Sequence, residues 1–344
     1  FEKLTFGSNV ASGATLHEDN IADGSTLTVT ATALTSTVLT FSAANETDGA
    51  VDITAGGTGD HQITLGNGND TYTSTSSAGE DVTATGGNNT ISTGDGADII
   101  IGGTGNDDIT GGAGADTFKF ATANLNSSDT IDGGAGTDIV HLTNDAVVVD
   151  SDFTNISNTE TLTAGTDINL TATLGSNASD SGLATVTLTD TGAANTVTVG
   201  SGFASNLTIN LSTDGTAGDT VTATNFTKNL TVEAADTSID TNASTLTGGS
   251  GTDNLKVSVT SSATLLLDSI TNFETITLTG DDDAADVATI TLADAVVASG
   301  KTLTIDGLLL NQDTNDAVLT FDGSAETNGN YVIKTAGAGA HTIT

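Results

Sequence analysis

Apolar and polar side chains alternate with a period of two over much of the chain. The alternation is regular in TLTVTATALTSTVLTF (26–41), ATVTLTD (184–190), LTINLST (207–213), NFETITLTG (272–280) and KTLTIDG (301–307). Because successive side chains of a strand point to opposite faces, this pattern predicts strands with one buried and one exposed face. No long stretch has the 3.6-residue period of an amphipathic helix. The sequence therefore predicts an all-β fold, and alternation this regular argues against the disorder that so polar and acidic a chain would otherwise indicate.

A nine-residue unit, Gly-Gly-x-Gly-x-Asp-x-apolar-x, recurs along the chain. Four units run in strict phase at 84–92, 93–101, 102–110 and 111–119, two looser units occupy 56–64 and 65–73, and single units stand at 133–141 and 248–256. Glycine permits backbone angles with positive φ, so these glycines predict a tight turn whose carbonyl oxygens can point to one side. The Asp-x-apolar-x that follows predicts a short strand.

Two such units would make one coil of 18 residues with a turn on each side. The apolar residues at the eighth position are then expected to face inward: Tyr72, Ile91, Ile100, Ile109 and Phe118. At this spacing Asp98 would lie above Asp116, and Asn89 above Asp107. Carboxylates stacked about 5 Å apart repel by roughly 3 kcal/mol at an effective dielectric constant near 20, and a divalent cation between them would remove this penalty. Hard oxygen ligands select calcium over transition metals.

The run 84–119 resembles the calcium-binding nonapeptide of RTX (repeats-in-toxin) proteins, which folds as a parallel β-roll. Consecutive in-phase units with Asp at the sixth position make this resemblance specific. The whole chain, with strands such as FETITLTG between glycine-aspartate turns, also resembles the lattice-forming part of bacterial surface-layer (S-layer) proteins and large RTX adhesins. The resemblance implies several calcium ions as cofactors and a parallel β-roll or β-solenoid, flanked by further β-solenoid or β-sandwich-like modules.

The resemblance also implies metal ligands by position. The matching carboxylates are Asp98, Asp107 and Asp116 in the phased units, Asp70, Asp138 and Asp253 in looser or single units, and Asp129 in the same phase nine residues before Asp138. The glycines of two units complete the candidate set: Gly102, Gly103, Gly105, Gly111, Gly112 and Gly114. His61 and Asn89 stand where Asp is expected, which predicts weak or empty sites there, although Asn89 stays in the candidate set; Ser244 predicts a site that lacks one carboxylate. Asp also favours turns without any metal, so plain turn chemistry is the alternative.

Two acidic loops outside the repeats are further candidates for calcium sites between modules. HEDNIADG (17–24) contains Glu18, Asp19 and Asp23, and GDDDAAD (280–286) contains Asp281, Asp282, Asp283 and Asp286. Neither loop fits the twelve-residue EF-hand pattern. A solvated acidic loop is the alternative in both places.

Longer repeats predict the domain organisation. Residues 133–165 parallel 248–280, and 26–64 resemble 302–344, which aligns Glu46 with Glu326 and His61 with His341. The prediction is a β module at 1–55, an RTX β-roll at 56–143, a β-rich module at 144–247, and a single RTX turn followed by a β module at 248–344 that resembles 1–64. The matching ends and the lack of an initiator methionine predict a segment of a tandem array.

Charge and composition exclude several classes of function. The chain has 44 Asp and Glu against 6 Lys and no Arg, which gives a formal charge of −38 and argues against a nucleic-acid partner or an anionic membrane surface. No apolar run is long enough to predict membrane insertion. The lack of Cys excludes disulfides, thiolate catalysis and Cys-ligated metals.

The sequence contains no recognisable catalytic motif. The four His residues lack metal-ligand spacing, and no Gly-x-Ser-x-Gly elbow, phosphate loop or His-Glu-x-x-His occurs. Paired carboxylates leave a glycosidase open, but carbohydrate-active sites use aromatic platforms, and the chain has no Trp and 2 Tyr. We therefore expect no enzymatic activity.

These observations lead to a functional hypothesis. We expect a secreted, calcium-dependent structural protein of the bacterial cell surface, whose partners are copies of itself in a layer or fibre; cell-surface polysaccharide is a further candidate partner. In this hypothesis the acidic chain is exported unfolded, and calcium outside the cell couples binding to folding. The alternative is a calcium-rigidified extender, or a ligand-binding segment, of a large RTX adhesin.

Overall fold

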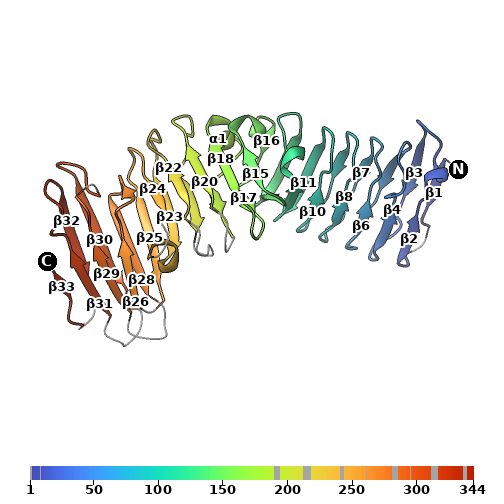
Figure 1. The fold of residues 1–344 in the computed structure, drawn as a ribbon. Helices are drawn as coiled ribbons and strands as arrows, with labels where there is room; N and C mark the ends of the chain where they lie inside the picture. Colours follow the sequence, from blue (N-terminus) through green and yellow to red (C-terminus); the bar gives the residue numbers. More distant parts are fainter. Residues whose placement is uncertain are drawn as a thin grey trace. The chain divides into compact units, whose positions relative to one another are not determined.

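The computed structural model describes residues 2–7, 9–189, 194–211, 218–240, 244–260, 262–280, 286–294, 296–310, 317–335 and 339–344. The chain forms two compact units. Unit 1 comprises 1–144, 150–163 and 180–183, and unit 2 comprises 145–149, 164–179 and 184–344. In each unit the strands pair in parallel and the chain winds as a β-solenoid (Figure 1). The four-part division expected from the sequence stays a prediction.

Unit 1 contains two parallel sheets, and consecutive strands alternate between them. The first has the order β1 (Lys3–Thr5), β3 (Thr26–Thr30), β5 (Ala50–Thr54), β7 (Thr71–Thr73), β9 (Thr90–Ser92), β11 (Asp108–Gly114), β13 (Thr130–Gly136) and β16 (Ile156–Ser157). The second has the order β2 (Ser12–Thr15), β4 (Leu39–Ser42), β6 (Gln62–Thr64), β8 (Asp81–Thr83), β10 (Ile99–Ile101), β12 (Thr117–Phe120), β14 (Ile139–Leu142) and β17 (Thr161–Ala164). Each coil of the repeat region therefore adds one strand to each sheet.

The core of unit 1 consists of apolar side chains stacked from coil to coil. Tyr72 pairs with Ile91 in the first sheet, and Ile100 pairs with Phe118 in the second. These side chains are buried, as is Ile109, so the prediction that the eighth position of each repeat faces inward is confirmed. Burying a side chain of this size stabilises the fold by about 1.5–3 kcal/mol. The alternating threonines of these strands lie on the outer face, which explains the Thr-x-Thr pattern.

In unit 2, consecutive strands also alternate between parallel sheets. One sheet has the order β19 (Thr185–Thr187), β21 (Leu207–Leu211), β23 (Leu230–Ala235), β25 (Asn254–Val259), β28 (Thr275–Gly280), β30 (Thr302–Leu309) and β32 (Asn330–Thr335). A second has the order β15 (Ala146–Val148), β18 (Leu170–Leu174), β20 (Thr196–Val199), β22 (Thr220–Thr222), β24 (Thr245–Thr247) and β27 (Ile270–Thr271), and a third contains β26 (Ser262–Leu266), β29 (Val287–Thr291), β31 (Val318–Asp322) and β33 (Thr342–Ile343). The described modules that flank the repeats are thus solenoid coils, the first of the two alternatives predicted for them.

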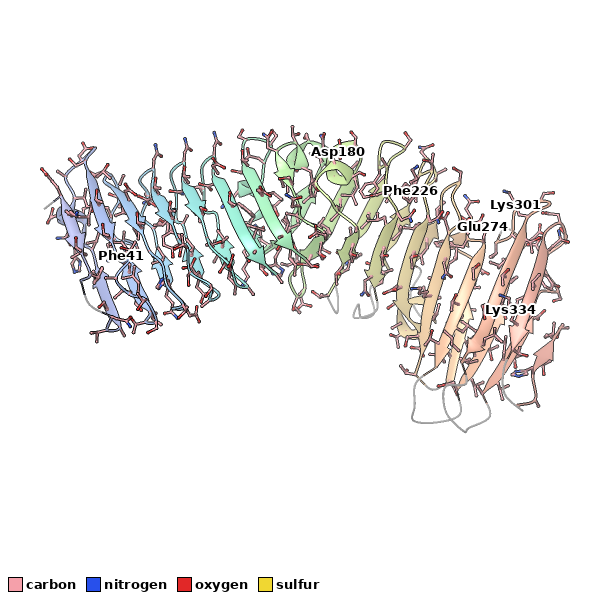
Figure 2. The ribbon with its side chains drawn as sticks, turned by 180° about the vertical axis from the view of Figure 1, so that it is seen from behind. Phe41, Asp180, Phe226, Glu274, Lys301 and Lys334 are labelled. Carbon is pink, nitrogen blue, oxygen red and sulfur yellow. The ribbon has the colours of Figure 1, made fainter. Side chains whose placement is uncertain are left out.

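Aromatic packing and a few ion pairs supplement the stacked strands of unit 2. Phe203 and Phe226 pack edge to face with ring centroids 5.9 Å apart, and both rings are buried. On the surface, Nζ of Lys334 (Figure 2) lies 2.9 Å from Oδ2 of Asp306. A pair this exposed contributes at most about 1 kcal/mol. The stability of this unit therefore depends on its buried stacks.

Helices make up little of the described chain. They are η1 (Glu18–Asn20), η2 (Thr122–Asn124), η3 (Asp150–Phe153), α1 (Ser176–Asp180) and α2 (Asp236–Asp240). In the part of the chain that the structure describes, none of them has the length or hydropathy to span a membrane. The all-β prediction is confirmed.

Candidate metal centre

Two columns of turns in unit 1 place a polar side chain directly before each strand of the repeat region. The first column contains Asp70, Asn89, Asp107 and Asp129, which precede β7, β9, β11 and β13. The second contains Asp98, Asp116, Asp138 and Glu160, which precede β10, β12, β14 and β17. The structure thus groups the candidate ligands of this region into two lines, one at each edge of the coil.

Within the second column, each side chain binds the backbone of the preceding coil. The Asp98 amide donates to Oδ1 of Asp116 at 2.8 Å, and the Asp116 amide donates to Oδ1 of Asp138 at 2.8 Å. The series begins with the Glu80 amide, which donates to Oδ1 of Asp98, and continues to Oε2 of Glu160, which accepts from the Asp138 amide at 2.8 Å. The predicted stacking of Asp98 and Asp116 is confirmed.

The first column repeats this arrangement. Each column is thus a ladder, in which a side chain accepts a hydrogen bond from the backbone amide of the corresponding residue in the preceding coil. The Asn89 amide donates to Oδ1 of Asp107 at 2.9 Å, and the Asp107 amide donates to Oδ1 of Asp129 at 3.0 Å. Oδ1 of Asn89 in turn accepts from the Asp70 amide at 3.0 Å. Asn89 therefore occupies the same structural place as the aspartates, and its predicted stacking on Asp107 is also confirmed.

The second carboxylate oxygen divides these aspartates into two groups. Among the aspartates of the two columns, Oδ2 is buried and has no hydrogen-bond partner in Asp98, Asp107, Asp116 and Asp138. In Asp70 and Asp253, by contrast, Oδ2 accepts a backbone amide of its own turn, from Gly66 at 3.0 Å and Gly249 at 2.6 Å. Oδ2 of Asp129 accepts from the Asn126 amide at 2.9 Å. A buried oxygen without a partner costs about 1–3 kcal/mol, so the first four residues have unused ligand capacity.

The glycines of the repeat make room for this arrangement. Gly112 and Gly114 have φ values of 107° and 148°, and a Cβ at Gly114 would overlap the carbonyl oxygen of Gly96 in the preceding coil. Gly102 and Gly111, which open their units, lie against Oδ2 of Asp107 and Asp116 respectively. The remaining candidates, Gly103 and Gly105, also have positive φ. The glycines therefore allow close stacking of the turns and leave space beside the carboxylates.

The structure adds one feature to the predicted tight turn. Residues 111–114 have the positive φ values expected at Gly112 and Gly114, and they also extend β11 and pair with β13, with Gly112 opposite Gly134 and Gly114 opposite Gly136. The two segments have the same sequence, Gly-Gly-Ala-Gly, so their backbones superimpose without intervening side chains. Pairing between consecutive coils thus includes the turn itself.

Burial raises the pKa of the ladder carboxylates. Removal from water is the largest cause in each residue, and it raises the pKa of Asp98, Asp107 and Asp116 to about 6. Burial likewise raises the pKa of Asp70 to about 6, while backbone hydrogen bonds from Val51 and Gly66 oppose the change. The pKa values of Asp129, Asp138 and Asp253 are also raised, mainly by burial. A nearby cation would favour the charged form of all of them.

The structure adds ladder residues that the repeat motif does not predict. In unit 2, Oδ1 of Asn195 accepts from the Leu170 amide at 2.8 Å, and Oδ1 of Asp219 accepts from the Asn195 amide at 2.8 Å. Oε2 of Glu274 accepts from the Asp253 amide at 2.8 Å, as Glu160 does for Asp138. The signal in the sequence was an Asn, Asp or Glu before Thr-apolar-Thr, without the Gly-Gly-x-Gly of the repeat at Asn195 and Asp219.

The positions at which another residue replaces Asp keep the ladder contact. Nδ1 of His61 accepts from the Leu39 amide at 3.0 Å, and burial lowers the pKa of this imidazole, which favours the neutral form that can accept. Oγ of Ser244 accepts from the Asp219 amide at 3.2 Å. The ladder contact therefore does not require a carboxylate. Of the acidic loop 280–286, Asp281, Asp282 and Asp283 lie outside the described residues.

Comparison with known families identifies the repeats. The family model of the RTX calcium-binding nonapeptide repeat (4 copies) matches residues 83–118 and 126–146. No curated protein and no solved structure matches the chain. These segments are thus RTX repeats, which bind several calcium ions and are typical of secreted proteins. They contain Asp98, Asp107, Asp116, Asp129 and Asp138.

The residues present fit calcium. Four aspartates of the two columns have a buried oxygen without a partner and provide negative charge, and the surrounding turns supply backbone carbonyls, so the donors are all oxygen. Asp98, Asp107, Asp116 and Asp138 would hold the ions, which would supply the positive charge that compensates these oxygens. Asp70, Asp129, Asp253, Asn89 and the six glycines stay predicted ligands.

Proposed function

We propose that this chain is part of a secreted structural protein that becomes rigid when calcium binds its repeat turns. The observation that carries the proposal is the buried, unpartnered Oδ2 of Asp98, Asp107, Asp116 and Asp138. These four oxygens make the metal-free fold costly, and calcium would offset that cost. Since metal binding to a site that exists only in the folded state adds to the folding free energy, calcium concentration becomes the switch for folding.

The charge of the chain supports folding outside the cell. With a formal charge of −38, the metal-free chain repels itself, which lowers the stability of its fold and raises the population of the expanded state at the low calcium concentration of the cytosol. Extracellular calcium neutralises the buried carboxylates, and the coils then stack. The proposed location is the bacterial cell surface or the extracellular medium.

Assembly with copies of the same chain is the next element of the proposal. A solenoid buries its apolar residues along its length and presents regular polar faces, which suits extension or tiling. The described chain offers acidic carboxylates and few lysines on these faces, so calcium shared between copies is the proposed link in an S-layer or fibre. In this proposal the segment has no catalytic role, and cell-surface polysaccharide is a further partner.

Electron microscopy of the purified chain tests this function. In millimolar calcium we expect ordered sheets or fibres that disperse when a chelator is added and re-form when calcium is restored. A chain that folds in calcium but stays monomeric at high concentration would contradict self-assembly and favour the adhesin extender. Glycan or cell binding by that monomer would then support the adhesin.

The matched control separates folding from assembly. The double variant D98N/D116N removes two buried charges of the second column, whereas D81N/D108N removes two charges from exposed side chains. We expect the first to need more calcium for ordered circular dichroism and for assembly, and the second to fold like the unmodified chain. Equal calcium requirements for both variants would contradict the proposal.

A further inference from the structure

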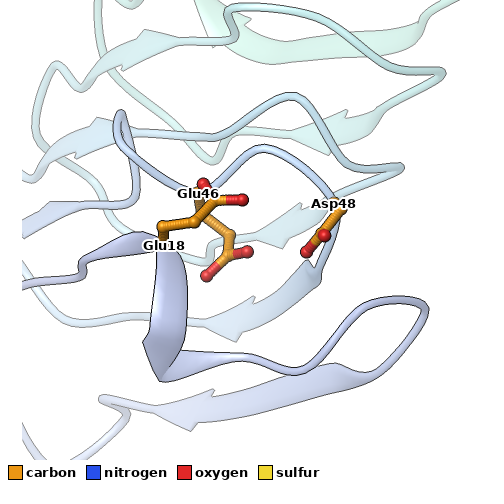
Figure 3. Close-up of side chains that lie close together, drawn as sticks. All are labelled: Glu18, Glu46 and Asp48. Atoms are coloured by element: carbon orange, nitrogen blue, oxygen red, sulfur yellow. The ribbon is translucent and has the colours of Figure 1, made fainter.

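Three acidic side chains outside the RTX repeats meet at one end of unit 1. Glu18 lies in η1, and Glu46 and Asp48 lie in the loop between β4 and β5 (Figure 3). Each offers a carboxylate oxygen, and these oxygens lie within 4.8 Å of one another. Calcium–oxygen distances are about 2.3–2.6 Å, so oxygens at this separation can share one ion.

The buried state of Glu46 distinguishes this group from an ordinary acidic surface. Its side chain is 0% exposed, whereas Glu18 and Asp48 are exposed. One oxygen, Oε1, accepts from the Gly49 amide at 3.1 Å, and the other, Oε2, is buried without a hydrogen-bond partner. Burying a carboxylate oxygen without a partner is costly, and two further carboxylates nearby increase the cost. A cation among the three would compensate all of these charges.

In the related sequence at the other end of the chain, both carboxylate oxygens of the corresponding glutamate have hydrogen-bond partners, and an asparagine takes the place of the third carboxylate. Glu326 corresponds to Glu46 and accepts from the Gly329 amide at 2.8 Å, as Glu46 accepts from Gly49. Its Oε2, however, accepts from the Val297 amide at 3.3 Å. Asn328 stands in the place of Asp48.

The hydrogen-bond partner of the threonine that follows each of these glutamates shows which residue corresponds to Glu18. The Thr47 hydroxyl donates to Oε1 of Glu18, and the Thr327 hydroxyl donates to Oδ1 of Asp294 at 2.6 Å. The segment near the C-terminus thus has Asp294, Glu326 and Asn328 where the segment near the N-terminus has Glu18, Glu46 and Asp48. Of these two segments, the one with the third carboxylate, Asp48, is also the one whose buried glutamate has an oxygen without a partner.

We propose that Glu18, Glu46 and Asp48 form a site for a divalent cation such as calcium, distinct from the turns matched as RTX repeats at 83–118 and 126–146. The site lies beside the looser repeat unit at 65–73, where the Asn67 amide donates to the Glu46 carbonyl at 3.0 Å. The ion would join η1 to the β4–β5 loop and so clamp two neighbouring coils beside the first repeat turn. Of the acidic loop at 17–24, this assigns Glu18 to the site and leaves Asp19 and Asp23 outside it. The proposal goes beyond calcium binding by the repeats, because it concerns residues that the repeat motif does not contain.

Counting bound ions in the full 344-residue chain tests the site. Native mass spectrometry at saturating calcium chloride should show one ion fewer for E18Q/D48N than for the unmodified chain. The control variant D19N/D23N removes the same charge from exposed residues of the same neighbourhood and should keep the full number. An unchanged count for E18Q/D48N, or an equal loss in both variants, would overturn the proposal.

Hydrogen–deuterium exchange gives a second, local readout, in which a folding defect of the repeats would be seen separately at 84–119. Calcium should slow exchange in peptides covering 43–49 and 84–119 of the unmodified chain. In E18Q/D48N we expect protection of 84–119 to persist and the calcium-dependent protection of 43–49 to disappear. Full protection of 43–49 in this variant would contradict the site, whereas loss in 84–119 would implicate the repeats instead.

Discussion

The backbone amide of Asp98 donates to Oδ1 of Asp116, 18 residues later in the chain. This contact fixes one oxygen of Asp116 as a partner of the preceding coil, while its Oδ2 stays buried without a protein partner. The two oxygens therefore have different functions: one aligns consecutive coils, and the other is available to a metal ion. Substitutions that alter only one of them separate coil stacking from calcium binding.

The substitution Asp116→Asn should weaken calcium binding without breaking the ladder. Asn89 already occupies such a position: its Oδ1 accepts from the Asp70 amide at 3.0 Å and its Nδ2 donates to the Gly86 carbonyl at 3.1 Å. We expect the calcium midpoint for folding to rise on the order of tenfold, which is about 1.4 kcal/mol. Calcium titration followed by far-ultraviolet circular dichroism measures this midpoint.

In metal-free solution the same substitution should stabilise the fold or leave its stability unchanged. Asn removes a buried negative charge, so the melting temperature should equal or exceed that of the unmodified chain. The control Asp108→Asn changes an exposed neighbour of Asp107 by the same charge and should alter neither measurement. A marked loss of metal-free stability in Asp116→Asn would show that the charge itself holds the coils together.

Stability of the metal-free chain should fall as pH rises from 5 to 7. The pKa values of Asp70, Asp98, Asp107 and Asp116 are raised to about 6 in the folded chain, from 3.8. The folded state thus binds protons that the unfolded state has released, and this contribution is complete below about pH 4 and lost as pH passes through about 6. Thermal unfolding of metal-stripped protein across this pH range shows whether the unfolding midpoint falls or rises with pH. A midpoint that rises with pH would contradict burial of these groups as free carboxyls.

Calcium should reverse that pH dependence. Protons and calcium compete for the same carboxylates, so the apparent calcium affinity should increase from pH 5 to pH 7, with release of protons on binding. Isothermal titration calorimetry in buffers of different ionisation enthalpy counts these protons. No proton release at pH 5.5 would indicate that the ions bind elsewhere.

The substitution Gly114→Ala should destabilise the repeat region by about 1–3 kcal/mol, because φ at this position is 148° and the new Cβ would overlap the Gly96 carbonyl. Gly7→Ala is the matched control, since a Cβ there has no atom within 4 Å. Chemical denaturation in saturating calcium measures both. Equal stability of the two variants would show that the turns do not stack as described.

Two adjacent isoleucines test the stacked core directly. Ile100 is buried between Val82 and Phe118, whereas Ile99 on the same strand is 36% exposed. Ile100→Ala should cost about 2–5 kcal/mol and Ile99→Ala much less. The difference between their denaturation midpoints reports which face of β10 points inward, and the reverse order would invert the assigned strand orientation.

The repeat motif was enough to predict much of unit 1. The spacing of Asp98 and Asp116 and the apolar residues at the eighth position gave the coil length and the inward face. The sequence did not reveal that β11 extends through Gly112 and Gly114, because pairing of a turn with its copy depends on the register of two distant segments. It also did not identify Asn195 and Asp219 as ladder residues, since no glycines mark their turns.

The acidic group at Glu18 shows a different limit. Its sequence neighbours Asp19 and Asp23 were natural candidates, yet the carboxylates that approach it come from the next coil, Glu46 and Asp48. Coils in this part of the chain are longer than the 18-residue repeat, so the periodicity that places the repeat aspartates does not place these residues. Only the folded backbone brings them together.

Anomalous X-ray diffraction from crystals grown in calcium tests the central claim most directly. We predict calcium peaks in the repeat turns beside Oδ2 of Asp98, Asp107, Asp116 and Asp138, with backbone carbonyl oxygens completing each coordination shell. Well-ordered turns with these four oxygens buried and no anomalous peak beside them, at saturating calcium, would contradict the account.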